Sequence, residues 1–275
     1  VTFITTFIFW FTGAWFSFQE NNNGMHMLFM LPGLLAPFII SLIMLFRSKE
    51  PALRKDFISR LFNLKRIQIK YLPVFLFLMP SAVLLSIIIS LPFGGSLSQF
   101  ELAEGFSFST GFVPVMLLLF LAATFEELGW RGYAFDSLQS RYDYFKASLL
   151  FSVLWSAWHV PLIFVKDSYQ YEVWQQNPWF AVNFFISIVP LGLIISWICI
   201  KNQKSVFAAI LFHFIINLSQ EVLAITQVTK CIETGVLMLV AGAIIFLDKE
   251  LFFSRIHPLA RIQTKGEAAC RQTGL

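Results

Sequence analysis

The sequence predicts an all-α fold, a polytopic membrane protein with about eight transmembrane helices. Hydrophobic residues make up 57% of its 275 residues and charged residues only 13%, about half the share that is usual in soluble domains. Long apolar runs recur along the chain, and most basic residues lie in the connections on one side of them. No internal repeat divides the chain, so residues 1–275 are expected to form a single membrane domain.

A helix that spans a bilayer needs roughly 20 predominantly apolar residues. Eight runs approach that length, although the first and the last are short. Prolines lie within the second and third runs, which membrane helices tolerate where neighbouring groups satisfy the freed backbone. The first run is expected to span rather than to be a cleaved signal, because no basic stretch precedes it. The expected spans are 3–18, 25–46, 71–91, 112–136, 147–165, 179–200, 205–226 and 234–247.

The basic residues test this division, because loops on the cytoplasmic side of a membrane protein are enriched in Lys and Arg. If all eight runs cross the membrane, one set of connections carries 18 of the 20 basic residues, and the other carries only Lys166 and Lys230. The basic side is expected to be cytoplasmic, and both termini lie on it. That side consists of 47–70, 131–146, 201–204 and the tail from residue 248.

Segment 47–70 is either a plain loop that sets the topology or an amphipathic helix on the membrane surface. Phe57, Leu61 and Leu64 recur in it at helical spacing with basic residues between them. Basic residues beside a membrane gain from anionic lipid, so membrane lipid is an expected partner. The net charge of +4 has this explanation, and no nucleic-acid partner is expected. The compact chain lacks eukaryotic sorting signals, which favours a bacterial plasma membrane.

The stretch FEELGWRGY at 125–133 places three charges at the end of an apolar run. Glu127 and Arg131 are four residues apart, so they share one helix face and can neutralise each other. Glu126 lies about 100° around the helix and has no partner on its own helix. Gly129 and Gly132 allow another helix to approach closely. The alternative is a charge cluster at a helix end, with no chemistry.

Two later runs carry further polar groups. His159 lies in an otherwise apolar stretch, with Pro161 two residues after it. His213 and Asn217 are four residues apart and therefore share a helix face. Taken singly, His159 is as readily a satisfied core histidine, and the pair 213/217 an interhelical hydrogen bond.

Depth favours convergence of these groups. At 1.5 Å per residue, Glu126 and His159 lie about 18 Å from the cytoplasmic ends of their helices, and His213 about 12 Å. Ionisable groups at such depth cost about 2.5–3.5 kcal/mol each on insertion scales, so they are retained when paired or functional. Three helices therefore place costly groups near one level, where they are expected to meet.

Together these residues can hydrolyse a peptide or an ester. Glu126 and His159 can hold and deprotonate a water molecule, while His213 and Asn217 donate hydrogen bonds to the developing oxyanion. No pattern demands a cofactor, but Glu126, His159 and His213 also match a zinc-hydrolase ligand set, which leaves a divalent metal such as zinc as an alternative. The sequence contains neither HExxH nor GxSxG, which disfavours the common zinc-protease and serine-hydrolase motifs.

The ordered motifs resemble those of the CPBP family, the CAAX prenyl endopeptidase and bacteriocin-processing intramembrane proteases, also called the Abi family. Its EExxxR motif is matched by Glu126, Glu127 and Arg131, and its HxxxN motif by His213 and Asn217. Its FxxxH motif is matched at His159, but Trp155 stands at the aromatic position. We expect that departure to change substrate fit more than chemistry. The resemblance covers residues 112–220, the expected catalytic core.

The resemblance implies an intramembrane endopeptidase in which Glu126 acts with His159 on water. It implies that His213 and Asn217 form the oxyanion site, and that Glu127 and Arg131 support them. The implied substrate is a membrane-associated peptide or a lipidated protein, either a prenylated CAAX tail or a leader peptide. Family members are described both as metalloproteases and as glutamate proteases. The alternative from another class is a non-catalytic member that acts as a membrane scaffold or in immunity to a peptide.

Overall fold

A computed structural model describes residues 1–20, 24–103, 109–110 and 113–254, and it confirms the helical fold class. The described strands are Ser109–Thr110 (β1) and Val113–Pro114 (β2), which pair antiparallel. The α-helices are α1 Thr2–Ser17, α2 Met27–Arg47, α3 Pro51–Phe62, α4 Leu72–Ser90, α5 Val115–Gly129, α6 Phe135–Gln139, α7 Tyr144–Trp158, α8 Tyr169–Gln176, α9 Pro178–Lys201, α10 Val206–Glu221, α11 Gln227–Leu247 and α12 Lys249–Phe253.

Five helical stretches in the described part of the chain are long and apolar enough to cross a membrane. They correspond to the expected spans 25–46, 71–91, 147–165, 179–200 and 234–247. The helix α10 is apolar but has 16 residues, and α1 also has 16. The count of eight and the side of each terminus therefore stay predictions. The basic tail beyond residue 254 lies outside the described residues. The five stretches are Met27–Arg47, Ile69–Phe93, Tyr144–Phe164, Pro178–Lys201 and Gln227–Leu247.

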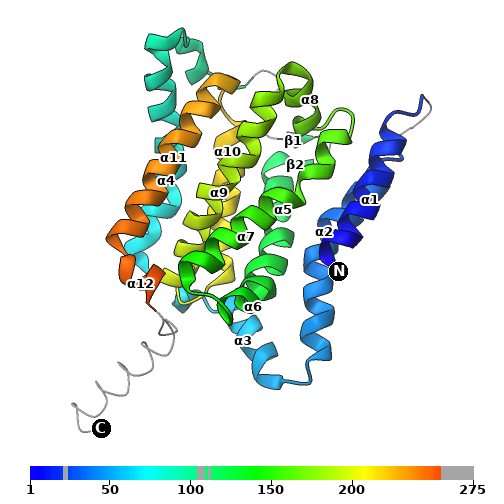
Figure 1. Ribbon diagram of the computed structural model, residues 1–275, viewed down its shortest axis with the longest axis vertical. Helices are drawn as coiled ribbons and strands as arrows, with labels where there is room; N and C mark the ends of the chain where they lie inside the picture. The colour runs from blue at the N-terminus through cyan, green and yellow to red at the C-terminus, as the bar shows by residue number, and fades with distance from the viewer. Residues whose placement is uncertain (21–23, 104–108, 111–112, 255–275) are drawn as a thin grey trace.

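The helices form a bundle whose middle is α9 (Figure 1). α9 packs against α7, α8, α10 and α11, and its Ile194, Ile195 and Ile198 are fully buried. α1 and α2 lie together at one side, with α4 and α11 at the other. α3, α6 and α12 lie at one end of the bundle, while α8 lies at the opposite end. The two ends correspond to the basic and the weakly basic sets of connections.

The expected close approach at the two glycines is confirmed. A side-chain carbon at Gly129 would lie 2.5 Å from the backbone carbon of Pro37, so α2 packs directly on the end of α5. Such a carbon at Gly132 would lie 2.7 Å from the ring of Phe57. Ser41 of α2 also donates a 3.0 Å hydrogen bond to the carbonyl of Gly129. Because both glycines lack a side chain, α2 and Phe57 of α3 can pack closely against the charged end of α5 and the turn after it.

Segment 47–70 contains the helix α3. The middle of α3 packs against other helices of the protein. Phe57 of α3 is 7% exposed and lies in a cluster with Leu128 and Ile210. Arg60, which is 2% exposed, donates to the carbonyl of Gly132 at 3.1 Å and to Asp136 at 2.8 Å. α3 is therefore fastened to the turn that follows α5.

That turn is a π-helix, Trp130–Ala134, which joins α5 to α6 without a break. Helix therefore continues past residue 136, where the expected span ended, with one widened turn. Single π-turns inside α-helices occur often at functional sites. This one carries Arg131 and begins four residues after Glu126.

Candidate active site

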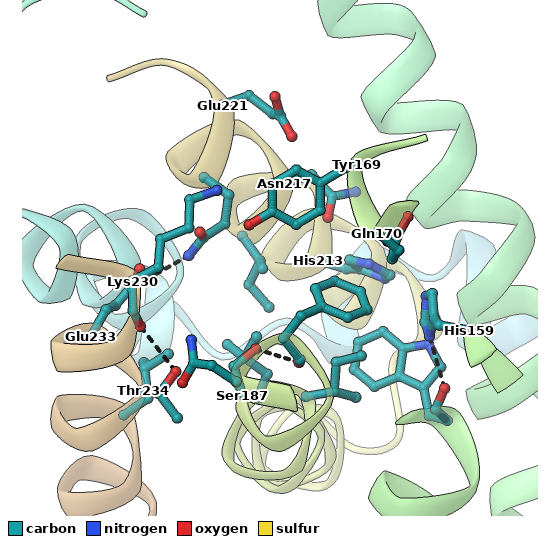
Figure 2. Close-up of a pocket in the computed structure, with 18 of the residues that line it drawn as sticks. His159, Tyr169, Gln170, Ser187, His213, Asn217, Glu221, Lys230, Glu233 and Thr234 are labelled. Carbon is teal, nitrogen blue, oxygen red and sulfur yellow. Dashed lines mark hydrogen bonds between the residues drawn. The ribbon is translucent and has the colours of Figure 1, made fainter. Parts of the chain in front are cut away.

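The structure brings the four expected residues around one cavity of about 250 Å³. Glu126 of α5, His159 at the end of α7, and His213 and Asn217 of α10 all line it. Figure 2 shows His159 at one side of the cavity and residues of α11 at the other, with His213 and Asn217 between them. Convergence of the three helices, expected from depth alone, is confirmed.

Glu126 is 7% exposed, and its partner comes from another helix. Its Oε2 accepts a 2.8 Å hydrogen bond from the indole Nε1–H of Trp155. The carboxylate is thereby held by one oxygen, which leaves the other for a ligand or a water molecule. This bond was not predicted from the sequence, because Trp155 was expected to affect substrate fit. Its position, one helical turn before His159, was the only feature of the sequence that placed Trp155 on the same helix face as this site residue.

His159 lies where α7 ends and a short 3₁₀-helix, Val160–Phe164, begins. Pro161 cannot continue the α-helical hydrogen bonds, which explains the change of helix type here. The ring Nδ1 lies 2.8 Å from the carbonyl oxygen of Trp155. A carbonyl only accepts, so Nδ1 carries the proton and the neutral ring keeps Nε2 as its acceptor.

The pair Glu127 and Arg131 is confirmed, and it includes a third member. Glu127 is fully buried, and its Oε1 lies 2.8 Å from Nη1 of Arg131 and 2.9 Å from Nδ1 of His213. A carboxylate beside a guanidinium is an acceptor, so Nδ1 of His213 is the donor. The bond fixes the imidazole ring on α10 and leaves Nε2 as the ring's other polar atom. Neither Glu127 nor Arg131 is among the described residues that line the cavity.

Arg131 is 1% exposed and lies between rings as well as beside a carboxylate. Its guanidinium carbon lies 4.1 Å from the ring centre of Phe151 and 5.3 Å from that of Trp155. The ring of Trp155 also meets His213 edge-on, with ring centres 5.2 Å apart. Trp155 therefore contacts Arg131 of the buried ion pair, His213 and Glu126.

The arrangement of the possible donors does not favour the metal alternative. No group of three or more His, Cys, Asp or Glu side chains in the described ranges is arranged to hold one ion. Glu126, His159 and His213 thus line a common cavity without forming a ligand set. One polar atom of each side chain is directed to a protein partner, namely Trp155 for Glu126 and His159, and Glu127 for His213. We derive no step through a metal.

The far end of the cavity holds polar residues that sequence reasoning missed. α11 begins at Gln227, earlier than the expected span at 234, so Lys230 and Glu233 are helical and line the cavity. Glu233 is 2% exposed and accepts a 2.6 Å hydrogen bond from Gln220. Their three-residue spacing was the available signal, because it places both side chains on one helix face.

Two comparisons with known proteins point to one family. The family model described as Type II CAAX prenyl endopeptidase Rce1-like matches residues 108–219, which contain all the expected site residues. The protein of Methanococcus maripaludis described as "CAAX prenyl protease 2" is 64% identical over 255 residues. That alignment covers 93% of this chain and 94% of the relative.

Replacing Arg131 by Met is expected to lower the free energy of unfolding by about 3–5 kcal/mol, because it leaves the Glu127 carboxylate buried without its cation. The double variant with Glu127→Gln is expected to recover part of that loss, since no uncompensated charge then remains. Denaturation in detergent measures both. Arg141→Met, which changes an exposed arginine at the same end, is the control. Equal stability of Arg131→Met and the control would contradict the role given to the pair.

Proposed function

The chain belongs to the Rce1-like CAAX prenyl endopeptidase family, and on that premise we propose that it is an intramembrane endopeptidase. In this proposal, water activated by Glu126 and His159 hydrolyses a peptide bond of a membrane-associated chain. The observation that carries it is the shared cavity, where a held carboxylate, a histidine acceptor and two further polar groups meet inside an apolar bundle.

Glu126 is the proposed general base. One of its oxygens is held by Trp155, so the other accepts a proton from the water molecule. The second proton of the same water bonds to Nε2 of His159, whose Nδ1–H is directed to a carbonyl. The water oxygen adds to the substrate carbonyl carbon as its proton passes to Glu126. When the C–N bond breaks, Glu126 returns that proton to the leaving amine.

His213 and Asn217 are the proposed oxyanion donors. The amide of Asn217 donates in any protonation state. His213 donates through Nε2 only as an imidazolium, because its Nδ1 proton already bonds Glu127. The bond to Glu127 fixes the orientation of the ring, which gives the supporting pair a part in positioning this donor. Charge that develops on the substrate oxygen is then met by groups already in position.

The proposed substrate is a prenylated CAAX-type tail. The support is the description of the 64% identical relative as a CAAX prenyl protease. A leader peptide is the other substrate that the sequence left open, and a panel of both peptide types separates them. In either case the reacting segment enters a cavity inside an integral membrane protein.

The change Glu126→Gln is expected to reduce turnover of prenylated CAAX peptides by at least about a thousandfold, since the amide cannot accept the water proton. The measurement is peptide cleavage by purified protein, with and without a chelator. We expect the wild type to remain active with chelator, because no three ligands are arranged for one ion among the described residues. Glu172→Gln, on the exposed face of α8, should cleave normally. Full activity of Glu126→Gln would falsify the assignment.

Trp155→Phe keeps an aromatic ring but removes the donor to Glu126. We expect kcat to fall by about tenfold, the low end for a hydrogen bond to a charged group, with KM unchanged. The indole N–H bonds the enzyme's own carboxylate, which is why KM should not respond. Trp158→Phe removes an indole donor that bonds Thr6 and is the matched control. A raised KM with unchanged kcat would instead support a role in substrate fit.

We propose from the basic-residue bias that the end with α3 is cytoplasmic, together with both termini. The α8 end of the cavity, lined by Tyr169 and Gln170, then faces away from the cytoplasm. The expected location, a bacterial plasma membrane, stays a prediction, and the similar protein is archaeal.

Single cysteines at Lys55 and Glu172, in a chain whose native cysteines are replaced, report the orientation. Both positions are exposed, on α3 and α8 respectively. A membrane-impermeant thiol reagent applied to intact cells is expected to label Glu172→Cys and not Lys55→Cys. The reverse pattern would place the cavity's α8 end in the cytoplasm, and the charge bias would then not govern the topology.

A further inference from the structure

Lys230 is an unexplained charge in the cavity. Among the described residues that line it, Lys230 is the only lysine or arginine. It is also one of the two basic residues that do not lie in the basic set of connections. A cation near the membrane interior is costly and is retained where it has a partner or a function.

Within the described part of the chain, Lys230 forms no ion pair. Its Nζ lies 4.6 Å from the ring centre of Tyr169, which comes from α8 on another wall of the cavity. Such a cation–π contact orients the ammonium group but leaves its three donors available for an anion. Lys230 is half-buried, so its charge is only partly screened by water.

The buried carboxylates of the cavity accept hydrogen bonds from residues other than Lys230, although the charge of Lys230 also acts on Glu233, three residues later on α11. Glu126 accepts from Trp155, and Glu233 accepts from Gln220 at 2.6 Å. Glu221 is exposed and lies at the edge of the view in Figure 2. Figure 2 shows His159 at one side of the cavity and Lys230 of α11 at the other. Glu126 lines the same cavity, so we call the side with His159 the reaction end and the side with Lys230 the cationic end.

We propose that Lys230 binds the terminal α-carboxylate of the substrate. This rests on the proposed peptidase function and adds what determines where the chain is cut. A CAAX motif is the last four residues of a protein, so its free carboxylate follows any bond cleaved within the motif by a few residues. Three extended residues reach about 10 Å, and Lys230 lines the same cavity as Glu126 and His159.

The consequence is that the enzyme selects substrates that have a free carboxyl terminus. A free carboxylate entering an apolar bundle loses its hydration, and an ammonium group oriented by Tyr169 replaces part of it. A substrate whose terminus is amidated or extended cannot make this contact. The enzyme is therefore an endopeptidase that measures its cleavage site from the carboxyl terminus.

The test compares one prenylated CAAX peptide as the free acid and as the C-terminal amide. The wild type is expected to prefer the acid by about tenfold in kcat/KM, the low end for a charged hydrogen bond because Lys230 is half-buried. Lys230→Met should lose the preference by cleaving the acid less well while cleaving the amide as before. Lys230→Arg should keep it. Lys166→Met, at the same end but outside the cavity, is the matched control.

Measuring peptide binding tests the role of Lys230 independently of turnover. Affinity of the two peptides is measured on Glu126→Gln with and without Lys230→Met, where the acid should bind about tenfold more weakly after loss of Lys230. An equal fall for acid and amide would show a structural role and overturn the proposal, as would a wild type that does not distinguish them. If the wild type cleaves neither peptide but Lys230 still determines binding of the acid, the peptidase assignment fails and the carboxylate site stands.

Discussion

One carboxylate oxygen organises the site. Oε1 of Glu127 bonds both Arg131 and His213, and so joins α5, the π-turn after it and α10. Inside an apolar bundle a single charge is costly, so each of these groups is stable only while the others remain in place. The positions of Glu126 and His213 at the cavity follow from this network, because one shares a helix with Glu127 and the other bonds it.

Several neighbouring helices pack against the end of α5 that carries Glu126 and Glu127. The absence of a side chain at Gly129 allows α2 to contact it, and Arg60 fastens α3 to the turn by bonds to backbone oxygen. Trp155 closes the other side, where its ring meets Arg131 and its N–H holds Glu126. α3, at one end of the bundle, is thus linked through Arg60 and the turn after α5 to the residues that we propose carry the chemistry.

The cavity divides its polar groups by task in our proposals. Acceptors and oxyanion donors lie around Glu126, whereas α11 contributes a cation whose partner is the substrate. Placing the two ends on different helices lets the protein hold both the bond that breaks and the terminus that identifies the chain. Such positioning converts binding energy into orientation at the reacting carbon.

The sequence by itself determined what depends on helical spacing. The helical class, five of the expected spans, the Glu127–Arg131 pair and the common level of Glu126, His159 and His213 follow from periodicity and residue depth, which are local properties. Only the tertiary structure decided contacts between helices distant in sequence. The bond from Trp155 to Glu126, the third partner of Glu127 and the position of Lys230 over Tyr169 depend on the rotation and separation of packed helices, which no local spacing specifies.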